Sequence, residues 1–149
     1  MKISDSVRAL LHHKGGEIYS VAPDITVFEA IRTMAEKNVG ALVVMEGGRL
    51  VGIISERDYT RKVALKGKSS KNAVVRELLS TPVHSVTPEH TVEDCMRIMV
   101  KHRVRHLPVL ENEKLSGVLS IGDLVNWTIT AQSQEIDQLK TFITGQYPG

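Results

Sequence analysis

The sequence predicts a mixed α/β (α+β) fold. It consists of two β-α-β-β-α units, with a helix at each end of the chain. Three observations predict it: an internal repeat, a helical spacing of apolar residues early in each copy, and two apolar runs joined by turn residues later in each copy. Neither copy alone can bury all of its apolar surface. We therefore expect the two copies to pack sheet against sheet about a pseudo-twofold axis.

The repeat emerges when the chain is aligned with itself at an offset of about 65 residues. Residues 18–60 then match residues 83–125 without a gap, and about a third of the aligned residues are identical. This alignment divides the 149 residues into five parts: an N-terminal helical segment at 1–17, repeat 1 at 18–66, a linker with the start of repeat 2 at 67–82, repeat 2 at 83–130, and a C-terminal helical tail at 131–149.

Each copy begins with a short strand-forming stretch that ends at a proline, and a helix is expected directly afterwards. Thr26 with Glu29, and Thr91 with Asp94, have the spacing of a capping box, which satisfies free amides in the first helical turn. Apolar residues follow at helical spacing: Val27, Ala30, Ile31, Met34 and Ala35 in the first copy, and Val92, Cys95, Met96, Met99 and Val100 in the second.

Two apolar runs follow each helix, and the turn residues between them predict a β-hairpin in each copy. A further helix is expected to begin near Ser55 in the first copy and near Ser120 in the second. The apolar runs are residues 41–45 and 50–54 in the first copy, and 107–110 and 115–119 in the second.

Helices are also expected outside the repeats, at about residues 3–13 and from Leu124 toward Ile143. The C-terminal helix carries an apolar stripe, which would pack either against the same chain or against a dimer mate, and the sequence leaves both open. The stripe on the C-terminal helix consists of Ile129, Ile136, Leu139 and Ile143.

Composition excludes several classes of function. The 19 basic and 17 acidic residues are scattered along the chain, so we expect no nucleic-acid partner. No apolar run approaches the roughly 20 residues that span a membrane. The single cysteine, Cys95, fits a buried helical face better than a nucleophilic role. The histidines outside the motifs show no spacing typical of a metal site and are interpreted as surface residues. A cytoplasmic location is expected.

A seven-residue stretch occurs once in each copy, as Gly52-Ile-Ile-Ser-Glu-Arg-Asp58 and Gly117-Val-Leu-Ser-Ile-Gly-Asp123. The simplest interpretation of its Ser-x-x-Asp pattern is a helix N-cap, worth about 1 kcal/mol. The other is a ligand cradle. Free amides at a helix N-terminus attract phosphate, and a carboxylate one turn later can accept hydrogen bonds from two ribose hydroxyls. The glycine would leave room for a ring or sugar beside the strand.

These motifs, in this order and doubled at a constant offset, resemble a tandem pair of CBS domains, also called a Bateman module. The resemblance covers almost the whole chain and is greatest to small stand-alone bacterial members and to plant proteins made of a single CBS pair. Besides the two seven-residue stretches, it rests on Val21-x-Pro23 with residues 38–44 in the first copy, and on Val86-x-Pro88 with residues 103–109 in the second.

The resemblance implies an adenosine ligand, namely AMP, ADP or ATP, with NAD or S-adenosylmethionine as further candidates, and no resident cofactor. In the family, the serine or threonine hydroxyl and neighbouring amides take phosphate, and the aspartate takes the ribose. The adenine is expected in an apolar slot beside the first strand of each copy, although these residues could equally be core. The implied nucleotide-binding residues are Ser20, Val21, Gly40, Ala41, Ser55, Arg57, Asp58, Ser85, Val86, Arg103, Arg105, His106, Pro108, Ser120 and Asp123.

The two copies differ in charge around the motif. Arg57 in the first copy stands where the second has Gly122, whereas cations gather before the second hairpin. These cations, Arg103, Arg105 and His106, would either neutralise a di- or triphosphate or form a solvated basic edge. The two sites therefore need not hold the same ligand.

No nucleophile and base pair, phosphate-binding loop or dinucleotide fingerprint is recognisable, so no enzymatic activity is expected. The expected function is a nucleotide sensor that forms a homodimer and signals, through a change in dimer conformation, to an unidentified partner protein. Two alternatives stay open: a ligand-independent dimerisation scaffold whose serines are only caps, and an adaptor for a redox or metabolic enzyme, as the plant relatives suggest.

Overall fold

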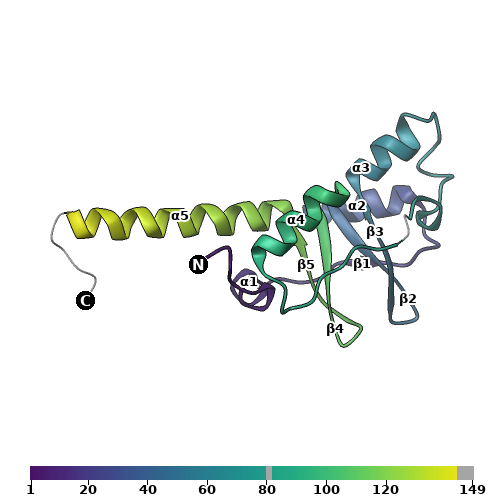
Figure 1. Ribbon diagram of the computed structural model, residues 1–149. Helices are drawn as coiled ribbons and strands as arrows, with labels where there is room; N and C mark the ends of the chain where they lie inside the picture. Colours follow the sequence, from purple (N-terminus) through teal and green to yellow (C-terminus); the bar gives the residue numbers. More distant parts are fainter. Residues whose placement is uncertain (80–81, 144–149) are drawn as a thin grey trace. The chain divides into compact units, whose positions relative to one another are not determined.

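The computed structural model describes residues 1–79 and 82–143, and the predicted mixed α/β class is confirmed (Figure 1). The predicted linker at 67–82 and tail at 131–149 include residues 80, 81 and 144–149, which lie outside the described part. The chain divides into two compact units that each combine distant stretches of sequence. Unit 1 comprises residues 1–15, 86–107 and 119–143, and unit 2 comprises residues 16–79, 82–85 and 108–118.

Unit 2 contains a sheet with the strand order β1-β2-β3. Strand β1 (Ser20–Val21) runs parallel to β2 (Ala41–Glu46), and β2 pairs antiparallel with β3 (Arg49–Ser55). Two glycines connect β2 to β3 with φ angles of 58° and 77°, the left-handed geometry that a tight hairpin requires. The predicted first hairpin is confirmed.

Helix α2 (Val27–Lys37) covers this sheet with the apolar face that the sequence predicts. Thr26 begins the helix by accepting a hydrogen bond from the Glu29 amide at 3.1 Å, and Asn38 ends it in a left-handed conformation. The short helix α3 (Glu56–Tyr59) follows β3 and continues into the π-helical turn η1 (Thr60–Ala64). The core of the unit includes Val27, Ala30, Met34, Leu42, Val44, Ile54 and Val63.

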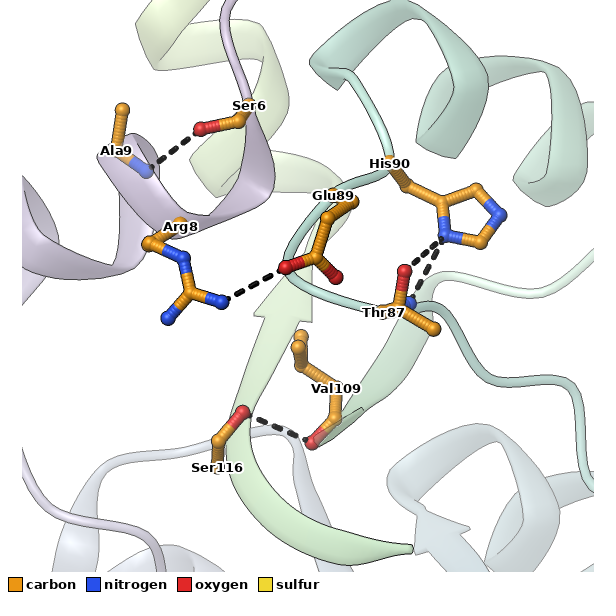
Figure 2. A network of polar contacts seen from close by, with 8 residues as sticks. All are labelled: Ser6, Arg8, Ala9, Thr87, Glu89, His90, Val109 and Ser116. Carbon is orange, nitrogen blue, oxygen red and sulfur yellow. Dashed lines mark hydrogen bonds and ion pairs between the residues drawn. The ribbon is translucent and has the colours of Figure 1, made fainter. Parts of the chain in front are cut away.

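Unit 1 contains helices α1 (Val7–Lys14), α4 (Val92–His102) and α5 (Ile121–Ile143). The prediction that the first helix starts near residue 3 is wrong. Ser6 caps α1 by accepting from the Ala9 amide at 3.2 Å (Figure 2). The chain before it folds into a turn, with the Asp5 amide donating to the Lys2 carbonyl at 3.0 Å. An extended cap residue cannot continue a helix backwards, so α1 starts at Val7.

Each repeat receives a short segment from the region that precedes the other repeat. In unit 1, the Val7 amide donates to the His90 carbonyl at 2.7 Å. Next to it, Arg8 forms an ion pair with Glu89 at 2.8 Å, which Figure 2 shows. This ion pair keeps the pKa of Glu89 below its ordinary value of 4.5. The chain segments before α4 and around α1 are thus held together by backbone bonds as well as by charge.

Unit 2 repeats this arrangement with the 3₁₀ turn η2 (Val75–Leu78). The Val75 amide donates to the Ile25 carbonyl at 3.0 Å, and Arg76 donates to the Asp24 carboxylate at 3.0 and 3.2 Å. Arg76 lowers the pKa of Asp24 through these bonds. The segments Val7-Arg-Ala-Leu and Val75-Arg-Glu-Leu therefore occupy equivalent positions, each on the other repeat.

Helix α4 confirms the predicted capping box, because the Thr91 amide donates to Asp94 Oδ2 at 2.9 Å and the Asp94 amide donates to Thr91 Oγ1 at 3.0 Å. The bonds from Thr91 hold the pKa of Asp94 below its ordinary value. Cys95 is fully buried on the apolar face, and desolvation raises the pKa of its thiol to about 11. The interpretation of Cys95 as a buried apolar residue is confirmed.

The second hairpin joins β4 (His106–Glu111) to β5 (Lys114–Ser120) in a two-stranded sheet, as predicted. Its turn residues, Asn112 and Glu113, both have positive φ angles, 51° and 65°, although neither is glycine. The predicted first strand of this copy shrinks to a single bridge residue, Val86. The chain turns directly behind it, since the Thr87 amide donates to His90 Nδ1 at 2.9 Å (Figure 2).

Helix α5 unites the two predicted helical stretches after Ser120 in one element of 23 residues. Only its first half packs onto unit 1, through Leu124, Trp127 and Ala131, and the Trp127 indole donates to the Lys2 carbonyl at 2.9 Å. The apolar stripe predicted along the helix is exposed in the described part of the chain. Among the described helices, none has the combination of length and apolar character that crossing a membrane would need.

The turn of the second hairpin yields a stability prediction. Glu113 has the left-handed conformation (φ 65°) that Gly48 (φ 77°) has in the first hairpin, and this conformation costs a residue with a side chain about 1 kcal/mol. We expect Glu113→Gly to raise the free energy of unfolding by about 0.5–1 kcal/mol in a denaturant titration, because the relief of strain outweighs the added chain entropy. The reverse change, Gly48→Glu, should lower it. A loss of stability in Glu113→Gly would contradict the strain assigned to this turn.

Candidate functional site

The first Ser-x-x-Asp pair forms a complete capping box at the junction between β3 and α3. Ser55 Oγ accepts from the Asp58 amide at 3.2 Å, while Asp58 Oδ2 accepts from the Ser55 amide at 2.9 Å and from the Ser55 hydroxyl at 3.0 Å. One turn further on, Lys62 Nζ lies 3.4 Å from Asp58 Oδ1 and donates to the Leu78 carbonyl at 2.8 Å. The capping interpretation is confirmed here, and a carboxylate beside a cation is half-buried at the junction.

The second pair repeats the box and adds a long-range ion pair. The Ser120 amide donates to Asp123 Oδ2 at 2.8 Å, and the Asp123 amide donates to Ser120 Oγ at 3.1 Å. Lys14, at the end of α1, places its ammonium 2.7 Å from the same Oδ2 atom. The Asp123 side chain is 21% exposed. The carboxylate that the sequence assigns to a ribose is therefore accessible, and a lysine 109 residues away binds it.

The same backbone hydrogen bond brings the preceding strand against the motif in each copy. The Glu56 amide donates to the Gly40 carbonyl at 3.0 Å, and Ala41 is the cross-strand partner of Ser55. In the second copy, the Ile121 amide donates to the Arg105 carbonyl at 2.8 Å. Gly40 and Ala41 thus lie beside Ser55. Likewise Arg105, and His106 at the start of β4, lie at the strand end next to the Ser120 junction.

The remaining predicted residues of the first copy lie on the same sheet. Ser20 and Val21 form β1 and pair with Val43 and Val44, which are the third and fourth residues of β2. Arg57 lies in α3 and is half-buried. The first set of predicted residues is therefore gathered in unit 2.

The second set is brought together only in part. Val86 is buried, and Arg103 is the exposed left-handed residue that ends α4, equivalent to Asn38. These two belong to unit 1 with Arg105, His106, Ser120 and Asp123, whereas the exposed Ser85 and the buried Pro108 belong to unit 2.

Gly52 lies against the end of the Leu79 side chain. A Cβ atom at this position would lie 2.7 Å from Leu79 Cδ2, which is too close for contact. The space expected beside the strand for a ring or sugar is therefore filled by the end of a leucine side chain, which must rotate before a ligand can lie there.

A pocket of about 280 Å³ lies next to the second motif, entirely within unit 1. Its wall presents an ammonium, a carboxylate, an amide, a hydroxyl and two rings, which are the groups that bind small polar molecules. The His13 and Trp127 rings meet edge to face, with centroids 5.6 Å apart at 81°. The pocket is lined by Met1, Leu10, His13, Lys14, Asp123, Asn126, Trp127 and Thr130.

Sequence reasoning missed Lys62 and every pocket-lining residue except Asp123. Lys62 lies four residues after Asp58 on helical structure, so this spacing could have identified it. Trp127 likewise lies four residues after Asp123 on α5, so the same spacing could have identified it. Lys14 and His13 gave no such signal, because only the folding of α1 against α5 brings them to Asp123. The sequence predicts His13 to be a surface residue; it is exposed, but its ring also contributes to the pocket wall.

Comparison with known proteins places these sites in context. The family described as CBS domain matches residues 7–65 and 75–129. The mitochondrial CBS domain-containing protein CBSX3 of Arabidopsis thaliana is 37% identical over 150 residues, covering 97% of this chain and 73% of that protein. The solved CBS domain NE2398 is 46% identical with a TM-score of 0.80, covering 84% of this chain and 98% of that one. A putative signal-transduction protein with CBS domains from Burkholderia ambifaria is 44% identical with a TM-score of 0.81, covering 86% and 96%.

The capping boxes yield a second stability prediction. Removing the hydroxyl in Ser55→Ala or Ser120→Ala leaves the Asp58 or Asp123 amide without its acceptor, so each change should lower the free energy of unfolding by about 1 kcal/mol. Ser133→Ala changes the same atoms at an exposed position inside α5 and should lower nothing. Equal effects of all three changes in a denaturant titration would rule out the capping role.

Proposed function

The chain belongs to the CBS-domain family, and from this premise we propose that it is a non-catalytic regulatory module that binds an adenosine nucleotide. The observation that supports this most is the pocket of about 280 Å³ at the second motif, where the Asp123 carboxylate and the Lys14 ammonium share one wall. Its size and mixed polar and apolar lining suit a small polar ligand with an aromatic part.

The chemistry of this wall matches a nucleotide in two respects. Ribose carries two adjacent hydroxyl groups, and a carboxylate such as that of Asp123 accepts both, at about 1.5–3 kcal/mol for each charged hydrogen bond. The Lys14 ammonium neutralises this carboxylate at 2.7 Å. On binding, the ribose would replace Lys14 at Asp123, and the released ammonium would pair with the phosphate.

The first motif would form a second, different site. Asp58 has Lys62 at 3.4 Å as its cation, and Arg57 lies within the motif where the second copy has Gly122. Leu79 fills the space beside Gly52, so binding there requires this side chain to move. We propose that the two sites differ in affinity, with the second site binding more tightly.

A ligand-independent scaffold is the second candidate function, and one observation favours it. Each Ser-x-x-Asp pair satisfies its own hydrogen bonds within the motif. In this alternative the aspartates serve only the start of α3 and α5. The two functions are separated by a change that preserves the cap and removes the charge.

Asp123→Asn is that change, because the amide oxygen still accepts from Ser120 while the negative charge is lost. We propose titration calorimetry of the full chain with AMP, ADP, ATP, NAD and S-adenosylmethionine. Wild type should bind at least one of them, and Asp123→Asn should weaken this binding at least about tenfold, the equivalent of one charged hydrogen bond. Asp58→Asn should affect only the weaker site.

Two controls complete the experiment. Asp137→Asn removes an exposed charge from α5 away from the pocket and should leave affinity unchanged. Lys14→Met should weaken ATP binding more than adenosine binding, because only the nucleotide carries phosphate. Absence of binding by all five compounds, or equal affinities of wild type, Asp58→Asn and Asp123→Asn, would favour the scaffold.

A further inference from the structure

Basic residues occur throughout the chain, but acidic residues are missing from one stretch. Residues 59–76 contain six of the 19 basic residues and none of the 17 acidic ones. The six are Arg61, Lys62, Lys66, Lys68, Lys71 and Arg76. The rest of the chain therefore carries more acidic than basic residues. The stretch that follows the second motif, residues 124–139, contains no basic residue, so the repeat itself does not require this charge.

Most of these six cations have no carboxylate partner. Among the described residues, only Lys62 and Arg76 form ion pairs. The other four have exposed side chains: Arg61, Lys66, Lys68 and Lys71. The Lys71 ammonium lies over the Phe28 ring, 5.3 Å from its centroid, a contact that leaves the charge unneutralised. Four such charges within a few turns of chain repel one another, and a polyanionic partner would relieve this repulsion.

The chain that carries these four cations is an ordered loop at the end of η1. The turn is closed by a hydrogen bond from the Lys68 amide to the Val63 carbonyl at 3.0 Å, with Gly67 in the left-handed conformation (φ 69°). Both features are typical of a Schellman motif. Further on, the Phe28 amide at the start of α2 donates to the Ser70 carbonyl at 2.9 Å. Binding through this loop therefore requires little additional ordering of the backbone.

One large apolar side chain lies among these charges. Leu65 directly precedes Lys66 and is 77% exposed. An aliphatic side chain between ammonium groups matches a lipid surface, because the leucine can enter the acyl boundary while the lysines stay at the headgroups. We call residues 61–71 the basic loop.

We propose that the basic loop docks on the surface of a membrane that contains anionic lipids, with Leu65 at the acyl boundary and the cations at the phosphate headgroups. Three of the four unpaired cations are lysines, which are depleted in interfaces between proteins. A single-stranded nucleic acid would be held by stacking on aromatic rings. The one aromatic residue in this stretch, Tyr59, packs against the core of unit 2. Docking of this kind needs no membrane-spanning helix.

The number of cations sets the strength of this docking. Each basic residue near an anionic lipid surface strengthens binding about fivefold. Four cations therefore give a reversible attachment rather than a permanent anchor. The attraction acts over about 10 Å at 0.1 M salt, so distant acidic residues of the chain do not cancel it, and the affinity should fall as the salt concentration rises.

Co-sedimentation of the full chain with lipid vesicles tests the basic loop. Wild type should bind vesicles of phosphatidylcholine and phosphatidylglycerol in a ratio of about 3:1, and should not bind vesicles of phosphatidylcholine alone. The triple variant Lys66→Gln, Lys68→Gln, Lys71→Gln should lower the affinity for the mixed vesicles about a hundredfold. Equal binding of wild type to both kinds of vesicle, or binding to neither, would overturn the proposal.

Two further triple variants serve as controls. Lys101→Gln, Lys114→Gln, Lys140→Gln removes the same charge from exposed positions outside the basic loop and should leave the affinity within about twofold of wild type. Arginine at all three loop lysines keeps the charge and should preserve binding. If the distant triple variant loses as much affinity as the loop variant, net charge rather than the basic loop is responsible, and the proposal is wrong.

The position of Leu65 at the membrane is tested by fluorescence. The native Cys95 is buried, so a dye reacts with a cysteine introduced at the surface. A polarity-sensitive dye on Leu65→Cys should shift its emission to shorter wavelength when the mixed vesicles are added. The same dye on Val100→Cys, a position in α4 that is 79% exposed, should not shift. Equal shifts at both positions, or none at position 65, would contradict the proposed docking.

Soluble polyanions separate lipid from other sources of negative charge. Leu65→Ser should weaken binding to the mixed vesicles at least about threefold and leave binding to oligothymidylate or polyglutamate unchanged, because only the bilayer offers an apolar phase. Tighter binding to either soluble polymer than to the vesicles, at equal concentration of negative charge, would assign the basic loop to a nucleic acid or an acidic protein and overturn the proposal.

Discussion

The fold depends on the reciprocal docking of two short segments. Val7 and Arg8 bind the entrance to α4, and Val75 and Arg76 bind the entrance to α2, each with a backbone hydrogen bond and an arginine ion pair to an acidic residue. Each repeat is thus completed by a piece of chain that precedes the other repeat. The two repeats therefore cannot be separated by cutting the chain between them without leaving both incomplete.

Much of the local structure follows from the sequence, because caps, turns and apolar spacing act over a few residues. Both amphipathic helices, both hairpins and the buried Cys95 are confirmed. The predicted start of α1 is wrong because Ser6 caps the helix later than the apolar pattern suggests. The reciprocal docking escapes prediction altogether. Val75 follows Val7 by 68 residues rather than 65, and this difference hides the match from a gapless alignment.

The candidate sites are predictable only where they are local. The two Ser-x-x-Asp boxes lie within one helical turn, and the pairing of Gly40 and Ala41 with Ser55 follows from the hairpin. The contact between Lys14 and Asp123 depends on the path of the whole chain. The likeness of the two motifs also conceals a difference, since one aspartate has a lysine from its own helical stretch and the other has a lysine from α1.

The continuity of α5 has a thermodynamic consequence. This single helix of 23 residues carries the Asp123 carboxylate of the pocket in its first turn and the uncovered isoleucines toward its far end. If occupancy of the pocket changes how strongly two chains associate, association must change the affinity of the pocket by the same factor. Dilution would then act on this protein as an effector, and its response to a ligand would depend on its own abundance.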